Sequence, residues 1–349
     1  MEIPTPPINK GYTGLANLGN TCFLNSCIQA LNHTYEFDQI RAKYERHVRP
    51  ERLESTILRE YEELRKIMSE NNGVVSPNQF VRQVHRVAAQ KGRDIFTGWA
   101  QNDMPEFLLF MIECIHASIS RGITVSIYGK KENPVDDLAV QCYHMLKQTY
   151  AKEYSEIVDM FYGISVSELW STDEKTRHSV NPEPYFILDI PIPLSMKRLP
   201  TLVDCLDAYT ETETLEGDNA WLNEKTGVRE PVRKRITFWN FPKVLVITLK
   251  RFTPDGMRKI NGLIEFPIDT LDLSKYVSGY APKSYMYELF AVCNHMGGVQ
   301  GGHYTAFAKR GNGEWLHFND TQVERIADPR QVMTPMAYCL FYRKKNAPV

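Results

Sequence analysis

Apolar residues recur at every third or fourth position in the first third of the chain, which is the spacing of amphipathic helices. This pattern predicts helices over residues 53–68 and 80–88. A third helix is expected over residues 104–118 and a fourth over residues 136–151. The N-terminal part of the chain is therefore expected to be mainly helical.

The pattern changes near Phe161, where short runs of Val, Ile, Tyr and Phe alternate with Pro, Gly and Asn, as strands and hairpins do. The expected strands are residues 185–190, 243–249, 287–293, 304–309, 314–318 and 338–342, with a hairpin turn at 311–313. Helices first and strands later predict an α+β fold with an active site at the seam between the two parts.

Composition and charge exclude several classes of protein. The 349 residues include 41 basic and 42 acidic side chains and 43% hydrophobic residues, which is typical of a soluble globular protein. Such balanced charge gives no general attraction to nucleic acid or to an anionic membrane. An acidic run at 204–218 and a basic run at 229–235 are interpreted as solvated faces.

Targeting signals and cysteine usage indicate a compartment. The longest apolar runs, such as residues 244–249, are far shorter than the roughly 20 residues of a membrane-spanning helix. The start of the chain carries acid and proline, unlike a secretory signal. Seven scattered cysteines without a Cys-x-x-Cys pair predict reduced thiols, and therefore a protein of the cytosol or nucleus.

Cys22 is the leading candidate for a nucleophile. It follows the polar residues of Gly19-Asn20-Thr21 and precedes apolar helical turns, so it is expected at a helix N-terminus. The helix dipole and free backbone N–H groups there favour a thiolate. By itself the position fits a buried structural cysteine better, as Cys27 is expected to be.

A thiol nucleophile needs a base, and His303 has the most suitable setting among nine histidines. Gly301 and Gly302 precede it and allow close approach of a ligand, and a predicted strand follows. One hairpin later, Asn319 or Asp320 is expected to reach the imidazole as its orienting partner.

Two further groups near these residues are of types that could have chemical roles. His295 follows Cys293 at the spacing of a possible metal site, but no further ligands are apparent, so a metal is not expected. Asn17 is placed to donate to an oxyanion near Cys22, although a role in forming the turn fits the local sequence better.

Two segments at opposite ends of the chain resemble the signature motifs of the ubiquitin-specific proteases. Residues 14–26, GLANLGNTCFLNS, resemble the cysteine box of that family. Residues 302–304 and 315–320 resemble its histidine box, and residues 96–108 resemble its Gln-Gln-Asp segment. The resemblance extends from about residue 11 to residue 345, and a 13-residue box with ordered downstream motifs is highly specific.

The resemblance implies a papain-like fold and a set of residue roles. It makes Cys22 the nucleophile, His303 the general base, Asn319 the orienting residue and Asp320 a second orienter. It also implies that Asn17 holds the oxyanion. One catalytic domain is expected, with a helical thumb at about 11–155, fingers mainly at 156–240 and a palm mainly at 241–349.

The resemblance also implies a narrow channel for a substrate tail that ends in Gly-Gly. Gly301 and Gly302 would form its narrowest part. The residues Gln101, Asp103 and Tyr304 would line it, and the helix after Gln101 is expected to start near Asp103, because proline at position 105 suits a first turn.

One departure from the family concerns zinc. Many members carry two Cys-x-x-Cys pairs in the fingers, but Trp170, Asp173, Asn223 and Thr226 stand at the aligned positions. We therefore expect no zinc and no cofactor, with the fingers held by strand pairing and by the packing of Trp170 and Trp221.

These features together predict a monomeric thiol isopeptidase that binds ubiquitin and ubiquitinated proteins, and neither nucleic acid nor membranes. Two alternatives stay open: a protease for another ubiquitin-like modifier, and a catalytically silent ubiquitin-binding scaffold. A papain-like enzyme for general peptides is a further possibility.

Overall fold

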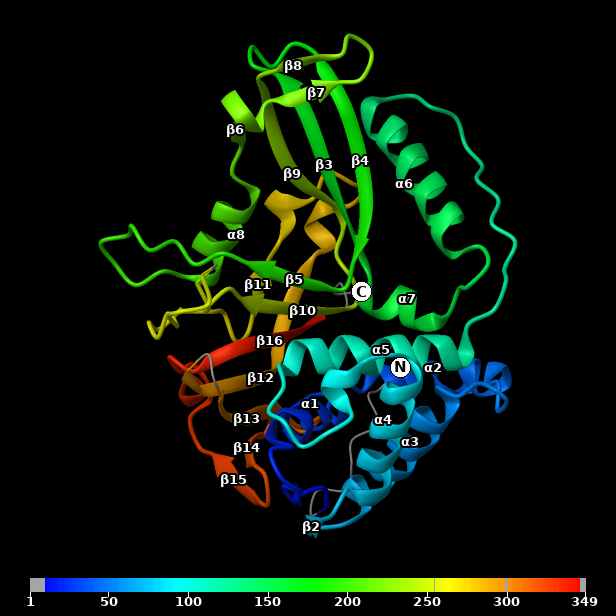
Figure 1. Cartoon of the computed structure of the whole chain (residues 1–349), viewed down its shortest axis with the longest axis vertical. Coiled ribbons are helices and arrows are strands. Elements are labelled where there is room, and N and C mark those ends of the chain that lie inside the picture. Colours follow the sequence, from blue (N-terminus) through cyan, green and yellow to red (C-terminus); the bar gives the residue numbers. More distant parts are fainter. Residues whose placement is uncertain (1–9, 254, 299–300, 346–349) are drawn as a thin grey trace.

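The computed structural model describes residues 10–253, 255–298 and 301–345. Helices dominate the first part of the chain and strands the second, and the two parts meet along one face (Figure 1). The α+β fold predicted from the sequence is thus confirmed. No helix among the described residues is long and apolar enough to cross a membrane.

The predicted helices are present, with small shifts at their ends. The helices of the first part are α1 (Cys22–Asn32), α2 (Glu36–Tyr44), α3 (Ser55–Glu70), α4 (Asn78–Gln90), α5 (Met104–Ile119), α6 (Pro134–Tyr150) and α7 (Glu156–Phe161). The Asp103 side chain caps α5 by accepting a hydrogen bond from the Glu106 N–H, so the helix starts where expected. The prediction did not include α2 or α7.

An eight-stranded sheet forms the second part. Its main order is β15-β14-β13-β12-β16-β10-β5, and β11 (Leu271–Asp272) pairs with β12. The other strands are β5 (Ile187–Ile190), β10 (Val244–Leu249), β12 (Met286–Gly298), β13 (Gly301–Lys309), β14 (Trp315–Asn319), β15 (Gln322–Ile326) and β16 (Ala337–Lys344). The pairs along this order are antiparallel except β10 with β5. The predicted strand at 185–190 is shorter than expected, because β4 ends at Tyr185 and Phe186 separates it from β5.

A separate four-stranded sheet projects from this body, with α6 alongside β4 (Figure 1). Its order is β4-β3-β9-β6, from β3 (Gly163–Ser171), β4 (Arg177–Tyr185), β6 (Glu213–Leu215) and β9 (Val232–Asn240). A small hairpin of β7 (Trp221–Asn223) and β8 (Val228–Glu230) lies at its far end, and β1 (Thr13–Leu15) pairs with β2 (Gly73–Val75) elsewhere. The helix α8 (Leu202–Thr210) occupies part of the acidic run.

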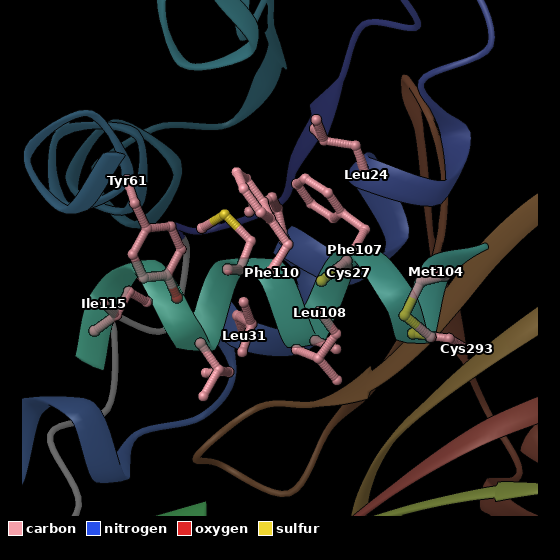
Figure 2. Close-up of a cluster of buried hydrophobic side chains, with 14 of the residues drawn as sticks. Leu24, Cys27, Leu31, Tyr61, Met104, Phe107, Leu108, Phe110, Ile115 and Cys293 are labelled. Carbon is pink, nitrogen blue, oxygen red and sulfur yellow. The ribbon is translucent and has the colours of Figure 1, made fainter. Parts of the chain in front are cut away.

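The largest apolar cluster surrounds α1. Ten of the eleven residues of α1 are buried. Figure 2 shows Leu24, Cys27 and Leu31 of α1 beside α5 side chains such as Phe107 and Leu108, and Cys293 of β12 belongs to the same cluster. Cys27 is fully buried, as expected of a core residue. Burial on all sides fixes α1, and with it Cys22, relative to both the helices and the sheet.

Charged side chains of the projecting sheet surround Trp170, which stands where many family members have a zinc-binding cysteine. The carboxylate of Glu168 accepts hydrogen bonds from Arg177 at 3.1 Å and from Arg235 at 2.6 Å. Both guanidinium groups lie over the ring of Trp170, with centroid distances of 5.8 and 5.6 Å. At the hairpin, Glu230 accepts hydrogen bonds from the side chains of Asn223 and Thr226. No described residues form a group of three His, Cys, Asp or Glu side chains able to hold a metal.

We expect this charge cluster to contribute stability in place of a metal. Replacing Glu168 by Gln removes the charge between two arginines and should lower the free energy of unfolding by about 1–3 kcal/mol, less than for a fully buried pair because the arginines are partly solvated. Thermal unfolding measures this loss, and Asp173→Asn in the exposed turn is the control. A chelator should not change the melting temperature of the wild type. A chelator-sensitive transition would contradict the assignment.

Candidate active site

A tight turn presents Cys22 at the first position of α1. Gly19 and Asn20 take up left-handed backbone with φ of 103° and 56°, conformations that glycine and asparagine adopt at low cost. The hydroxyl of Thr21 accepts a hydrogen bond from the Leu18 N–H at 2.9 Å, which closes the turn. The expected position of Cys22 at a helix N-terminus is therefore found.

Opposing influences act on the thiol of Cys22, because the helix N-terminus favours a thiolate whereas burial favours the neutral thiol. Burial raises the pKa of the thiol above its ordinary value, and the negative charge of Asp320 raises it further. Backbone N–H groups of Tyr304, Phe23 and Cys22 oppose this effect but do not overcome it. A base is therefore needed to remove the proton.

His303 and Asn319 lie side by side on neighbouring strands. The Nε2 atom of His303 is 2.7 Å from Oδ1 of Asn319, so Nε2 carries a proton and donates it. This leaves Nδ1 as the basic nitrogen. The backbone N–H of Tyr304, the residue after His303, hydrogen-bonds to the sulfur of Cys22, so Cys22 lies against β13 one residue from the candidate base.

Asp320 has a different set of partners from Asn319. Its carboxylate accepts hydrogen bonds from Nδ2 of Asn17 at 2.9 Å and from Nδ2 of Asn25 at 2.8 Å. Oδ1 of Asn17 accepts from the backbone N–H groups of Gly19 and Thr21. Both ends of the Asn17 amide are thereby fixed, and one Nδ2 hydrogen remains for an oxyanion beside Cys22.

Gln101 joins the helical part to the sheet across the predicted channel. Its Nε2 donates to the carbonyl oxygen of Gly302 at 2.9 Å, and its Oε1 accepts from the Gly302 N–H at 2.6 Å. A Cβ atom on Gly301 would lie 2.3 Å from Oε1 of Gln101. A Cβ on Gly302 would lie 2.0 Å from the carbonyl oxygen of Met296. Close packing against backbone therefore requires glycine at 302, whereas at Gly301 the contact is with a flexible side chain and the backbone φ of 150° favours glycine.

Asp103 lines the same channel, and two tyrosines hydrogen-bond to its carboxylate. The hydroxyl of Tyr338 donates to Oδ2 of Asp103 at 2.8 Å, and Tyr304 also hydrogen-bonds to this carboxylate. Burial raises the pKa of Asp103 despite these hydrogen bonds. A cavity of about 270 Å³ lies here, lined by residues that include Gln101, Asp103, Gly302 and Tyr304.

Replacing Gly302 by Ala should disable the channel. The added methyl group must displace β12 or the Gly302 backbone next to His303, and we expect kcat/KM to fall about tenfold to a hundredfold. Gly262→Ala is the matched control, since its Cβ would meet nothing within 4 Å. Steady-state hydrolysis of a ubiquitin fluorophore conjugate measures both. Equal activity of the two variants would show that the close packing at Gly302 is not needed.

The sequence did not identify Asn25, which anchors Asp320, or Tyr338, which anchors Asp103. Asn25 lies three residues after Cys22 in α1, a spacing that places both on one face of the helix, and this was the available signal. A larger cavity of about 510 Å³ lies elsewhere, lined by charged residues such as Arg41 and Arg65. It includes neither Cys22 nor His303.

Comparison with known proteins identifies the family. The sequence model of a family described as "Ubiquitin carboxyl-terminal hydrolase" matches residues 13–342. The chain belongs to this family, which confirms the resemblance to ubiquitin-specific proteases. It is 34% identical over 355 residues to ubiquitin carboxyl-terminal hydrolase 2 of Homo sapiens, covering 97% of this chain and 56% of the relative.

Other relatives agree with this assignment. Ubiquitin carboxyl-terminal hydrolase 21 of Mus musculus is 29% identical, with 98% of this chain and 63% of the relative covered. The chain thus spans little more than half the length of several curated relatives that it matches.

Solved structures share the fold. A structure of the SAGA Ubp8/Sgf11/Sus1/Sgf73 DUB module bound to ubiquitin aldehyde has a TM-score of 0.73 at 23% identity, covering 100% of this chain and 72% of that chain. A related structure bound to monoubiquitin also has a TM-score of 0.73, at 24% identity, with 97% of this chain and 70% of that chain covered. The papain-like fold of the family is therefore that of this chain.

Proposed function

We propose that this chain is a thiol isopeptidase that hydrolyses the bond after the C-terminal glycine of ubiquitin. One observation carries the proposal. The sulfur of Cys22 hydrogen-bonds to the backbone of Tyr304 in β13, and the preceding residue, His303, is paired with Asn319. Membership of the family and the ubiquitin-bound structures of proteins with the same fold support ubiquitin as the modifier.

The reaction begins with proton transfer, because burial favours the neutral form of the Cys22 thiol. Nδ1 of His303 takes the proton while the sulfur attacks the carbonyl carbon of the last glycine. Asn319 accepts from Nε2 and stabilises the imidazolium that forms. The free Nδ2 hydrogen of Asn17 and a backbone N–H at the start of α1 hold the oxyanion.

Collapse of the tetrahedral intermediate breaks the C–N bond, and His303 returns its proton to the departing lysine amine. A thioester between Cys22 and the glycine remains. Water then attacks this thioester, with His303 again taking a proton, and releases the ubiquitin carboxylate and the free thiol. Gln101 must release Gly302 or share its hydrogen bonds for the tail to occupy the channel.

A ubiquitin derivative with a thiol-reactive electrophile at its C-terminus tests the proposal. We expect one covalent adduct per protein by intact mass, and peptide mapping should place it on Cys22. An adduct with a different ubiquitin-like modifier alone would favour the protease for that modifier. The absence of any adduct on folded protein that still binds ubiquitin would favour the silent scaffold. Cleavage of short peptides without a modifier would favour a general papain-like enzyme.

The proposal extends to partners and place of action. Ubiquitin and ubiquitinated proteins are the proposed partners, and the chain is proposed to act as a monomer, without nucleic acid or membrane. All seven cysteines are free thiols and buried, which supports a reducing compartment, the cytosol or the nucleus.

A further inference from the structure

A tryptophan is exposed beside the turn that presents Cys22. Trp99 lies in the segment between α4 and α5, which crosses α1 in the view of Figure 1, and 55% of its surface is exposed. Its carbonyl oxygen accepts a hydrogen bond from Nδ2 of Asn20 at 2.8 Å, and a Cβ atom on Gly19 would lie 3.7 Å from its ring. The ring of His85 in α4 packs edge to face against it, at a centroid distance of 5.0 Å. Trp99 is therefore held in place and presents an apolar surface near the nucleophile.

The outer face of α4 adds positive charge next to Trp99. Arg82 lies one helical turn before His85, and Arg86 lies one turn after Arg82, so the two arginines share the solvent face beside the ring contact. Both residues are exposed, and α4 contains no acidic residue. Among the residues that the structure describes, neither arginine has an acidic partner within salt-bridge distance. Guanidinium groups that no ion pair neutralises attract carboxylates, which they bind through two parallel N–H donors.

This surface lies outside the channel and against the catalytic turn. None of the described residues that line the channel cavity belongs to it. A small hollow between α4 and the turn is lined by residues that include Gly19, Thr21 and His85. The strand that precedes α4 also contacts the segment before Asn17, because the Ala16 N–H donates to the carbonyl oxygen of Val75 at 2.9 Å. The helix α4 is thus fixed beside the residues that surround the scissile bond.

The acceptor protein, which carries the ubiquitin-linked lysine, comes within reach of this surface. In the proposed reaction the ubiquitin tail occupies the channel as far as Cys22, so the acceptor continues outside the channel. A lysine side chain spans roughly 6 Å from Cα to Nζ, so the residues that flank the modified lysine lie close to the catalytic turn. An exposed indole and two guanidinium groups there match a chain with apolar and acidic side chains.

We propose that Trp99, Arg82 and Arg86 form an acceptor-binding surface that selects modified proteins with acidic residues next to the ubiquitin-linked lysine. This inference rests on the proposed function, because it names the class of acceptor for the same reaction. Trp99 packs against apolar parts of the acceptor chain, and the two arginines pair with its carboxylates. These contacts form with the bound substrate and persist in the transition state, so they act on KM more than on kcat.

Two peptide conjugates test the selection of acidic acceptors. Ubiquitin is joined through its C-terminal glycine to the lysine of two peptides of equal length, one with Asp and Glu and the other with Lys and Arg on both sides of that lysine. At low ionic strength the wild type should cleave the acidic conjugate with kcat/KM about tenfold higher, and the ratio should approach one in high salt, which screens exposed charges. Equal rates at low ionic strength, or faster cleavage of the basic conjugate, would overturn the proposal.

Reversal of charge on α4 tests the two arginines. Arg82→Glu combined with Arg86→Glu should invert the preference, so that the basic conjugate is cleaved faster than the acidic one. Arg59→Glu in α3 is the matched control, because Arg59 is also an exposed helical arginine, with 70% of its side chain accessible, and lies outside the surface. This control should keep the preference of the wild type. A preference for the acidic conjugate that survives the double reversal would rule out the arginines.

Replacing Trp99 by alanine tests the apolar contact. The substitution keeps the backbone carbonyl that holds Asn20, so the catalytic turn retains its hydrogen bond. We expect KM to rise about threefold to tenfold for both peptide conjugates, and to change less than about twofold for a ubiquitin fluorophore conjugate, which has no acceptor chain. An equal rise for all three substrates would mean that Trp99 acts on ubiquitin or on the turn, and its place in the acceptor-binding surface would be wrong.

Labelling of wild-type Cys22 by the ubiquitin electrophile separates the two levels of inference. If the wild type is not labelled, the proposed function fails, and the acceptor-binding surface fails with it. If the wild type is labelled and cleaves the acidic and basic conjugates equally well at low ionic strength, only the acceptor-binding surface fails.

Discussion

Replacement of Cys22 by alanine is expected to abolish hydrolysis, lowering kcat by a factor of about 10⁴ or more. The nearest thiol in sequence, Cys27, is fully buried in the α1 core and has no access to substrate. Burial and the neighbouring Cys293 raise its pKa well above the ordinary value, so it has no thiolate to offer. No substitute nucleophile is therefore available in α1.

Ubiquitin binding should survive this substitution. Cys22 is 3% exposed, so loss of its sulfur removes little of the surface that a bound protein contacts. Titration calorimetry with ubiquitin measures the affinity, and hydrolysis of the fluorophore conjugate measures kcat. Cys142→Ala in α6 is the control with an intact site. Retained hydrolysis in Cys22→Ala would exclude Cys22 as the nucleophile.

Asp320→Asn is expected to lower kcat about a hundredfold, with little change in KM, because Asp320 acts by holding the Asn17 amide beside the oxyanion. Asparagine tolerates the left-handed backbone at this position, where φ is 49°. It carries one acceptor oxygen in place of two, so Asn17 and Asn25 can no longer both be held as they are.

A double-mutant cycle separates this role from orientation of His303. If Asp320 acts through Asn17, adding Asn17→Ala to Asp320→Asn should cause little further loss. Asn319→Ala should add its own loss to either variant, since Asn319 contacts His303 instead. If the fall in kcat of the double variant equals the product of the falls in Asn17→Ala and Asp320→Asn, then Asp320 does not act through Asn17.

The charge of Asp320 also affects the nucleophile directly. Because its negative charge raises the pKa of the Cys22 thiol, Asp320→Asn should lower that pKa. The rate of alkylation by iodoacetamide as a function of pH measures this, and its midpoint should move to lower pH in the variant. An unmoved midpoint would show that the carboxylate does not act on the thiol.

Local sequence was enough to predict the elements whose signals are strong and continuous. The helices α3, α4 and α5 have long apolar periodicity, and the strands β10 and β16 have dense runs of branched and aromatic residues. The short helix α8 was not predicted, because its acidic residues were interpreted as a solvated run. One of them, Asp204, completes a capping box with Thr201.

The parts of the site that depend on distant partners could not be predicted. Asn25 meets Asp320 across 295 positions, and Lys259 meets His295 across 36, so no local pattern reports either contact. The net direction of the Cys22 pKa shift could not be predicted for a related reason. The helix N-terminus is visible in the sequence, whereas the burial that outweighs it depends on how α1 packs against the sheet.

The burial that raises the pKa of the Cys22 thiol also affects how the nucleophile survives under oxidative conditions. Peroxide reacts with thiolates far faster than with thiols, and oxidation beyond the sulfenic acid destroys a nucleophile permanently. Because burial and the charge of Asp320 raise the pKa of this thiol, we expect peroxide to oxidise Cys22 more slowly than an exposed thiol at a helix N-terminus.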